Sequence, residues 1–175
     1  MALLAVKEHK HAAPSRVTCA VLIASDTRTA QSDRSGPIVR RLLEEGGHVV
    51  AAHRIVPDDP ERITYSVRAW ADDTTIDAVI VSGGTGLAPR DNTYEAVSQL
   101  FTARIDGFGE LFRMLSYEAI GSAAMLSRAV AGLIGTTVLF ALPGSPSACE
   151  LALAKLVVPE LGHAVSLANP HKWRR

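Results

Sequence analysis

Two carboxylates stand in glycine- and proline-rich stretches where metal-assisted phosphate chemistry could take place. Asp58 lies in the segment VPDD (56–59), and Asp91 closes the segment SGGTGLAPRD (82–91). Carboxylate oxygens are preferred ligands of Mg²⁺, which bridges them to phosphate oxygens. Two carboxylates beside a phosphate-binding loop would repel a nucleotide unless such a cation lay between them. The pair therefore suggests a Mg²⁺-dependent reaction at a phosphate group.

Each of these residues also has a simpler interpretation. Asp91 is the type of residue expected where a helix begins, and Asp58 could be a solvated surface carboxylate. Asp59, by contrast, is the expected cap of the helix that begins at Pro60. Arg90 could pair with Asp91 in a surface ion pair or neutralise phosphate charge. Residue type alone leaves both interpretations open.

The GGTG segment allows a ligand to approach the main chain closely. Gly83, Gly84 and Gly86 can adopt positive φ. Successive amide groups around Thr85 could form an anion-binding nest in front of a helix N-terminus. The alternative is a tight strand-to-helix turn without a ligand. The segment matches neither a Gly-Lys-Ser/Thr phosphate-binding loop nor a GxGxxG dinucleotide fingerprint, so neither familiar route to a nucleotide is present.

Polar clusters follow four apolar runs of the sequence. Ser25 and Asp26 follow the first run, and 58–59, 83–86 and 143–146 follow three later ones. Ligands of open parallel sheets bind beyond the carboxyl ends of the strands. The shared position of the clusters predicts one ligand site more strongly than any single cluster does.

Two further segments could contribute to that site. Pro143, Gly144 and Ser145 combine a fixed turn with a helix start, whose amide groups can cap a helix and bind an anion together. Arg128, next to Ser127 and in front of a strand, is either an anion contact or a surface residue. The sequence offers no Ser/His/Asp or Cys/His arrangement, and its histidines have no metal-binding spacing.

Alternating strands and helices must position these clusters. The expected strands are 17–25, 49–56, 77–82, 129–134 and 137–142, and the fourth could lie at an edge and run antiparallel. Expected helices start with a cap at Ser35, at Asp59 and at Asn92; another breaks at Gly121, and the last, 148–158, is interrupted by Pro159. Short connections predict an α/β fold with a parallel sheet and helices on both faces.

Composition describes an ordinary globular domain. The chain has 175 residues, 47% of them hydrophobic and 21% charged, with a formal net charge of zero, so we expect no binding to nucleic acid or to an anionic membrane. Cys19 and Cys149 lie in apolar stretches and are expected as reduced core residues of a cytoplasmic protein. We expect residues 1–15 to form a flexible leader and 16–175 a single domain, with no membrane-spanning run.

Six motifs, taken together and in order, resemble the molybdenum-cofactor biosynthesis proteins of the MoaB/MogA type. They are Asp26 with DRSGP (33–37), VPDD (56–59), SGGTGLAPRD (82–91), GFGELFRMLS (107–116), SRA (127–129) and LPGSP (142–146). The resemblance covers nearly all the chain from residue 17, and RMLSYEAIG, SRAVAG and NPHKW are closer to the MoaB branch. Tyr94 and Asp106 depart from it, because proline is common at both positions in the family.

The resemblance implies a three-layer α/β/α sandwich with a mostly parallel sheet that binds molybdopterin. Active members are Mg²⁺-dependent molybdopterin adenylyltransferases, which transfer AMP from ATP to the molybdopterin phosphate and release pyrophosphate. Asp58 and Asp91 match the family's acidic pair, with implied catalytic or metal-binding roles. The nucleotide- and pterin-binding residues then expected are Ser25, Asp26, Gly83, Gly84, Thr85, Gly86, Arg90, Ser127, Arg128, Pro143, Gly144 and Ser145.

The implied assembly is a homotrimer or a hexamer built from trimers, with a partner protein that inserts molybdenum. Two other functions stay open. The chain could be a non-catalytic molybdopterin-binding or carrier protein, since some MoaB-branch members lack the acidic residue at the position of Asp91. It could also be a nucleotide hydrolase that uses a related domain, as in competence-damage-inducible-type proteins. Because both Asp58 and Asp91 are present, the enzyme is the preferred hypothesis.

Overall fold

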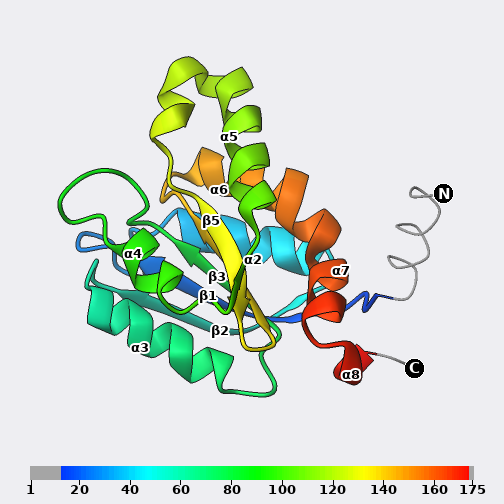
Figure 1. The fold of residues 1–175 in the computed structure, drawn as a ribbon. Coiled ribbons are helices and arrows are strands. Elements are labelled where there is room, and N and C mark those ends of the chain that lie inside the picture. The colour runs from blue at the N-terminus through cyan, green and yellow to red at the C-terminus, as the bar shows by residue number, and fades with distance from the viewer. Residues whose placement is uncertain (1–12, 174–175) are drawn as a thin grey trace.

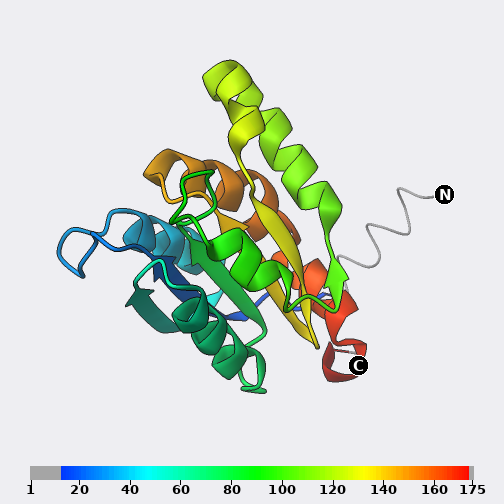
Figure 2. The ribbon, with the colours of Figure 1, turned by 60° about the vertical axis from the view of Figure 1, so that its left-hand side comes forward.

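A mostly parallel sheet forms the centre of the fold (Figures 1 and 2). The computed structural model describes residues 13–173, so the expected leader lies outside the described residues except for its last three. Within this range one sheet has the strand order β2-β1-β3-β6-β5-β4. The strands are β1 (Thr18–Ala24), β2 (Val49–Val56), β3 (Ala78–Ser82), β4 (Ala103–Arg104), β5 (Val130–Ile134) and β6 (Thr137–Leu142). β2, β1, β3 and β6 are mutually parallel, whereas β5 and β4 run antiparallel to their neighbours.

Helices cover both faces of this sheet (Figure 1). They are α2 (Ser35–Glu45), α3 (Pro60–Ala71), α4 (Thr93–Ser98), α5 (Asp106–Ile120), the 3₁₀ segment η1 (Gly121–Leu126), α6 (Pro146–Ala152), the π-helical segment η2 (Leu153–Val157), α7 (Val158–Ala168) and α8 (Pro170–Trp173). One buried cluster lies between the sheet and α2, α5, α6 and α7, and a second lies between the sheet and α3 and α4. The predicted α/β sandwich is therefore confirmed.

The central strand β1 shows why its sequence is a continuous apolar run. Cys19, Val21 and Ile23 belong to the first cluster, and Ala20 and Leu22 belong to the second. Successive side chains of a strand point to opposite faces, so a strand with helices on both sides is apolar at every position. Cys19 and Cys149 are both free and buried, as predicted, and burial raises the pKa of the Cys19 thiol to about 12.

Two expectations about the C-terminal half are wrong. β5 is not at the edge, because the two-residue strand β4 pairs with its outer side; its antiparallel direction is confirmed. Pro159 does not interrupt the last helix, which continues to Ala168. Proline removes a helical hydrogen-bond donor and crowds the preceding turn. The wider π-helical turn of η2 directly precedes it, and such turns are one known way for a helix to absorb an irregularity.

By length and composition alone, one helix of the described chain could cross a membrane, the 23-residue stretch Pro146–Ala168. Its most buried side chains lie along one face of the helix, and they are Cys149, Ala152, Leu153, Val157, Leu161 and Val165. All six belong to the core cluster that packs on the sheet. The apolar face formed by these six side chains is accounted for by its place in the core.

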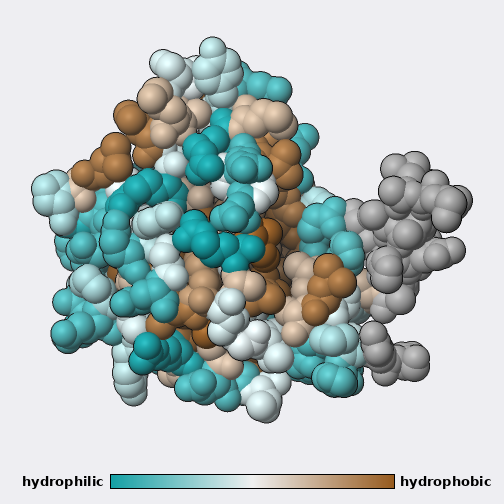
Figure 3. All heavy atoms as spheres, in the orientation of Figure 1, coloured by the Kyte–Doolittle hydropathy of each residue, from teal (hydrophilic) through white to brown (hydrophobic). Residues whose placement is uncertain are grey.

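An arm formed by α5 and η1 projects beyond the sheet (Figures 1 and 2). As predicted, the chain breaks at Gly121, which has a φ of +67°. The arm carries exposed apolar side chains, and the surface there is partly hydrophobic (Figure 3). These side chains are Leu111, Met114, Tyr117, Ile120, Met125 and Leu126, with exposed fractions between 47% and 76%.

Candidate active site

The four polar clusters meet at the edge of the sheet that the carboxyl ends of its strands form, as the sequence predicts. Ala24 pairs with Val56, and Ser82 pairs with both Ile23 and Leu142. The strand ends are also joined by main-chain hydrogen bonds, from Ser25 N to Val56 O at 2.8 Å and from Gly83 N to Leu142 O at 3.0 Å. Because these strands are parallel, their carboxyl ends place the loops after β1, β2, β3 and β6 next to one another.

Three carboxylates gather at this edge. The main-chain N–H of Asp58 donates to Asp26 Oδ1 at 3.0 Å, and Asp58 Oδ1 is buried without a hydrogen-bond partner. Burial, together with the negative charges of Asp26 and Asp91, raises the pKa of Asp58 to about 6 against the opposing effect of Arg90. Such a perturbed carboxyl group is typical of functional sites. Asp58 is therefore not simply a solvated carboxylate.

The glycines of the GGTG loop leave space for these carboxylates. Gly84 has a φ of +61°, and a Cβ atom there would lie 2.1 Å from Asp58 Oδ1 and 2.5 Å from Thr93 Oγ1. A Cβ atom on Gly86 would lie 2.5 Å from Asp91 Oδ2. Gly83, with a φ of +107°, turns the chain against Ala24 O. Gly86 is not among the glycines with positive φ. The loop is thus a turn, and its glycines also let acidic side chains contact the main chain.

Asp91 is held by the loop that it closes. Its Oδ2 accepts a hydrogen bond from Ala88 N at 2.9 Å, and its own N–H donates to Ala88 O at 2.8 Å. Asn92 precedes α4 as expected, but its side chain donates to Asp58 O and Arg90 O rather than capping the helix. These contacts tie the loop after β2 to the loop after β3. Asp58 and Asp91 thereby face the same edge from two neighbouring loops.

A cavity of about 410 Å³ opens among the loops after β1, β3 and β6, and none of the three carboxylates lines it. Its lining includes Ser25, Gly83 and Gly144 from three of the predicted clusters, together with Arg28 and Arg34. The two guanidinium groups suit an anionic ligand such as a phosphate. The sequence did not single out Arg28 and Arg34 as site residues, although Arg34 lies within the DRSGP motif and Arg28 lies in the same loop.

The start of α2 differs from the prediction. Asp33, not Ser35, satisfies the helix N-terminus, since Asp33 Oδ1 accepts from Ser35 N at 2.9 Å and from Gly36 N at 3.1 Å. The Ser35 hydroxyl instead donates to Gly144 O at 2.7 Å and links α2 to the loop after β6. A buried carboxylate stabilises this helix N-terminus more than a hydroxyl would, because it accepts several charge-assisted hydrogen bonds there. Ser145 caps α6 by accepting from Ala148 N at 3.3 Å.

The remaining predicted residues lie around the same edge. Thr85 is buried and Arg90 is exposed. Ser127 Oγ accepts from Ala129 N at 3.3 Å, and Pro143 O accepts from Cys149 Sγ at 3.3 Å. The Arg128 guanidinium contacts the main-chain carbonyls of Gly86 and Asp91 and the Glu95 carboxylate. The structure thus brings all the predicted residues to one edge, with Arg128 engaged inside the protein.

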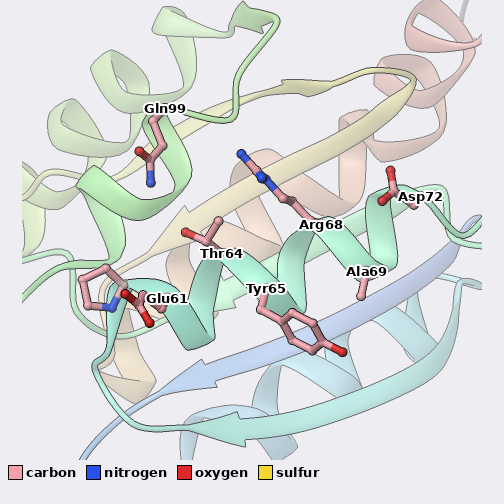
Figure 4. A pocket seen from close by; sticks show the side chains of 8 residues that line it. Glu61, Thr64, Tyr65, Arg68, Ala69, Asp72 and Gln99 are labelled. Carbon is pink, nitrogen blue, oxygen red and sulfur yellow. The ribbon is translucent and has the colours of Figure 1, made fainter.

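A larger groove, of about 590 Å³, lies elsewhere, along the outer face of α3 (Figure 4). Its lining consists of Pro60, Glu61, Thr64, Tyr65, Arg68, Ala69, Asp72 and Gln99. It contains none of the predicted site residues. Size alone therefore does not locate the site, and the strand-end edge is the better candidate.

The fold and this edge together define an α/β protein with a candidate ligand site at the carboxyl ends of its strands. Comparison with known proteins identifies the protein family to which the chain belongs. The chain belongs to the family described as "Probable molybdopterin binding domain", whose model matches residues 20–163. The resemblance seen in the six motifs is thereby confirmed.

Individual relatives agree along nearly their full lengths. The chain is 51% identical to molybdenum cofactor biosynthesis protein B of Bacillus subtilis (strain 168), over 93% of this chain and 96% of that protein. A crystal structure of a molybdenum cofactor biosynthesis protein B has a TM-score of 0.87 at 49% identity, covering 91% of this chain and 99% of the other. The tungsten cofactor synthesizing protein MoaB from Pyrococcus furiosus has a TM-score of 0.79 at 35% identity, covering 89% and 99%.

Proposed function

We propose that this protein acts in molybdenum cofactor biosynthesis by transferring AMP from ATP to the phosphate of molybdopterin in a Mg²⁺-dependent reaction. The observation that carries the proposal is the Asp58 carboxyl group, with one buried, unpartnered oxygen and two further carboxylates close by. Family membership supports molybdopterin as the ligand. ATP, Mg²⁺ and adenylyl transfer are the part of the proposal that goes beyond family membership.

The residues present fit a Mg²⁺ ion. Asp58 and Asp91 would hold it, since Asp58 Oδ1 lacks a partner and the pKa of Asp58 is raised by burial and by neighbouring negative charge. No group of three or more His, Cys, Asp or Glu residues in the described chain could hold a metal by itself. Mg²⁺ commonly uses only one or two carboxylates and completes its shell with water and substrate phosphates. When bound, it would neutralise charge on the phosphates and on the departing pyrophosphate.

The chain's other residues bind and orient the substrates. Arg28 and Arg34 line the cavity that would receive a phosphate group, and the exposed Arg90 lies beside Asp91. An oxygen of the molybdopterin phosphate attacks the α-phosphorus of ATP, and the bond to the pyrophosphate oxygen breaks in line with it. Catalysis of this kind depends on positioning and charge neutralisation, so no nucleophilic side chain is required.

The direct test is an incubation of the purified protein with molybdopterin, ATP and Mg²⁺, with the products identified by mass spectrometry. We expect adenylyl-molybdopterin and pyrophosphate in equal amounts. Binding of molybdopterin without turnover would contradict the enzyme and identify a carrier. Pyrophosphate or phosphate release without molybdopterin would identify a nucleotide hydrolase instead.

We also propose that copies of this chain assemble through the arm of α5 and η1, as a trimer or a hexamer built from trimers. The support is the group of large apolar side chains that the arm exposes, since monomeric proteins rarely expose contiguous apolar patches of this kind. Cytoplasmic location and a partner protein that inserts molybdenum remain predictions.

Sedimentation of matched variants tests this assembly. We expect a mass of three or six chains for the unmodified protein, and smaller species for Met114→Glu combined with Tyr117→Glu. Tyr65→Glu, which changes another exposed tyrosine ring, on α3, is the control and should leave the mass unchanged. A monomeric unmodified protein would rule the assembly out.

A further inference from the structure

We propose that Arg128 is a positioning residue that holds the loop of residues 86–91, and through it the Asp91 carboxylate, rather than a ligand contact. The effect on turnover rests on the proposed function, whereas the effect on the loop does not. The side chain of Arg128 lies in front of β5 and reaches across to the loop that follows β3.

Arg128 joins the two ends of this loop. Its Nε donates to Gly86 O at 2.9 Å, and its Nη2 donates to Asp91 O at 2.8 Å. Its main-chain N–H also donates to Thr85 O at 3.2 Å, just before the loop begins. Hydrogen bonds from a charged donor are about twice as strong as neutral ones. The planar guanidinium presents its donors in a fixed fork, so one side chain can hold both carbonyls at a set separation.

The first turn of α4 holds Arg128 from the other side. Arg128 Nη1 is ion-paired with Glu95, and the Arg128 guanidinium carbon lies 5.1 Å from the ring centre of Tyr94. Arg104 lies over the same ring at 5.8 Å and donates to the Tyr94 hydroxyl at 3.3 Å. Both guanidinium groups therefore lie within reach of the Tyr94 ring, whose electrons attract cations. This gives a structural role to a residue at which the sequence departs from the family pattern.

Inside the loop, Asp91 depends on the position of the main chain. Its carboxylate accepts from Ala88 N, and its Oδ2 lies against Gly86. Loosening of the two carbonyls that Arg128 holds would thus shift the carboxylate. The cavity with Arg28 and Arg34 is built from other segments, so it should keep its shape. Loss of Arg128 should consequently lower turnover more than substrate binding.

Hydrogen exchange of the peptide that covers residues 85–93 tests the loop directly. In Arg128→Gln we expect the protected amides of Ala88 and Asp91 to exchange at least about tenfold faster, because two charge-assisted hydrogen bonds are lost. Glu95→Gln removes only the exposed outer partner and should give a smaller change of the same sign without a risk to folding. Arg113→Gln is the matched control, since Arg113 donates to Ser127 O but does not contact the loop.

Steady-state kinetics of Arg128→Lys supply the second measurement. Lysine keeps the charge but cannot bridge both carbonyls, so we expect kcat to fall by about tenfold to a hundredfold with KM for molybdopterin unchanged. Unchanged loop exchange in Arg128→Gln would overturn the proposal, and a rise in KM without a change in exchange would show a ligand contact instead. If the unmodified protein binds molybdopterin without turnover, the proposed function fails, and the exchange comparison alone decides the role of Arg128.

Discussion

Asp91→Asn should lower the kcat of AMP transfer by at least about a hundredfold, the size of effect seen when one preorganised electrostatic group is removed from an active site. Asparagine keeps a side-chain oxygen that can accept from Ala88 N, so the loop should retain its shape. The substitution removes the negative charge but leaves the packing. Steady-state kinetics should therefore show a loss of activity, whereas thermal unfolding should show an unchanged melting temperature.

Asp73→Asn is a close control for this substitution. The Asp73 carboxylate also accepts from a main-chain N–H, that of Thr75 at 2.9 Å. It is exposed and precedes the amino end of β3, whereas the site lies at the carboxyl ends of the strands. It should retain full activity. An Asp91→Asn protein with the kcat of the unmodified protein would show that Asp91 has no part in the reaction.

Asp58→Asn should both abolish turnover and stabilise the fold at neutral pH. The folded-state pKa of Asp58 is raised from 3.8 to about 6, so ionisation of this group opposes folding. A shift of this size corresponds to about 3 kcal/mol at about 1.4 kcal/mol per unit, and solvent screening of a partly exposed group reduces it to about 1 kcal/mol. Urea unfolding at pH 7.5 measures the difference in unfolding free energy.

The difference in unfolding free energy between Asp58→Asn and the unmodified protein should depend on pH. A raised carboxyl pKa leaves stability unaffected below about pH 4 and costs stability progressively as pH rises towards 6, after which the cost is constant. The advantage of Asp58→Asn should follow the same course. Mg²⁺ should reduce it above pH 6, because a cation stabilises the ionised carboxylate. A constant difference across this range would contradict the assigned pKa.

Much of the site could be predicted because strand ends of a parallel sheet share an edge. The apolar runs before Ser25, Asp58 and Gly83 were readable as buried strands, and parallel pairing then brings their carboxyl ends together. The positive φ of Gly83 and Gly84 was likewise expected from residue type. Local pattern and topology were sufficient for these residues.

Other features depend on contacts between distant segments, which no local pattern contains. Ser35 and Asp33 are both acceptable caps for α2, and the choice follows from the hydrogen bond of Ser35 to Gly144, 109 residues away. Arg128 looks like an anion contact until its carbonyl partners in the loop after β3 are known. The two-residue strand β4 has no hydrophobic period of its own and exists through pairing with β5.

Transfer of label from ATP tests the central claim most directly. The protein is incubated with molybdopterin and Mg²⁺ and with ATP labelled either at the α- or at the γ-phosphate, and the pterin and pyrophosphate are then separated. Attack at the α-phosphorus predicts α-label in the pterin and γ-label in pyrophosphate, with both appearing at least about a hundredfold more slowly in Asp91→Asn. Molybdopterin that stays bound but unlabelled with the unmodified protein would contradict the account.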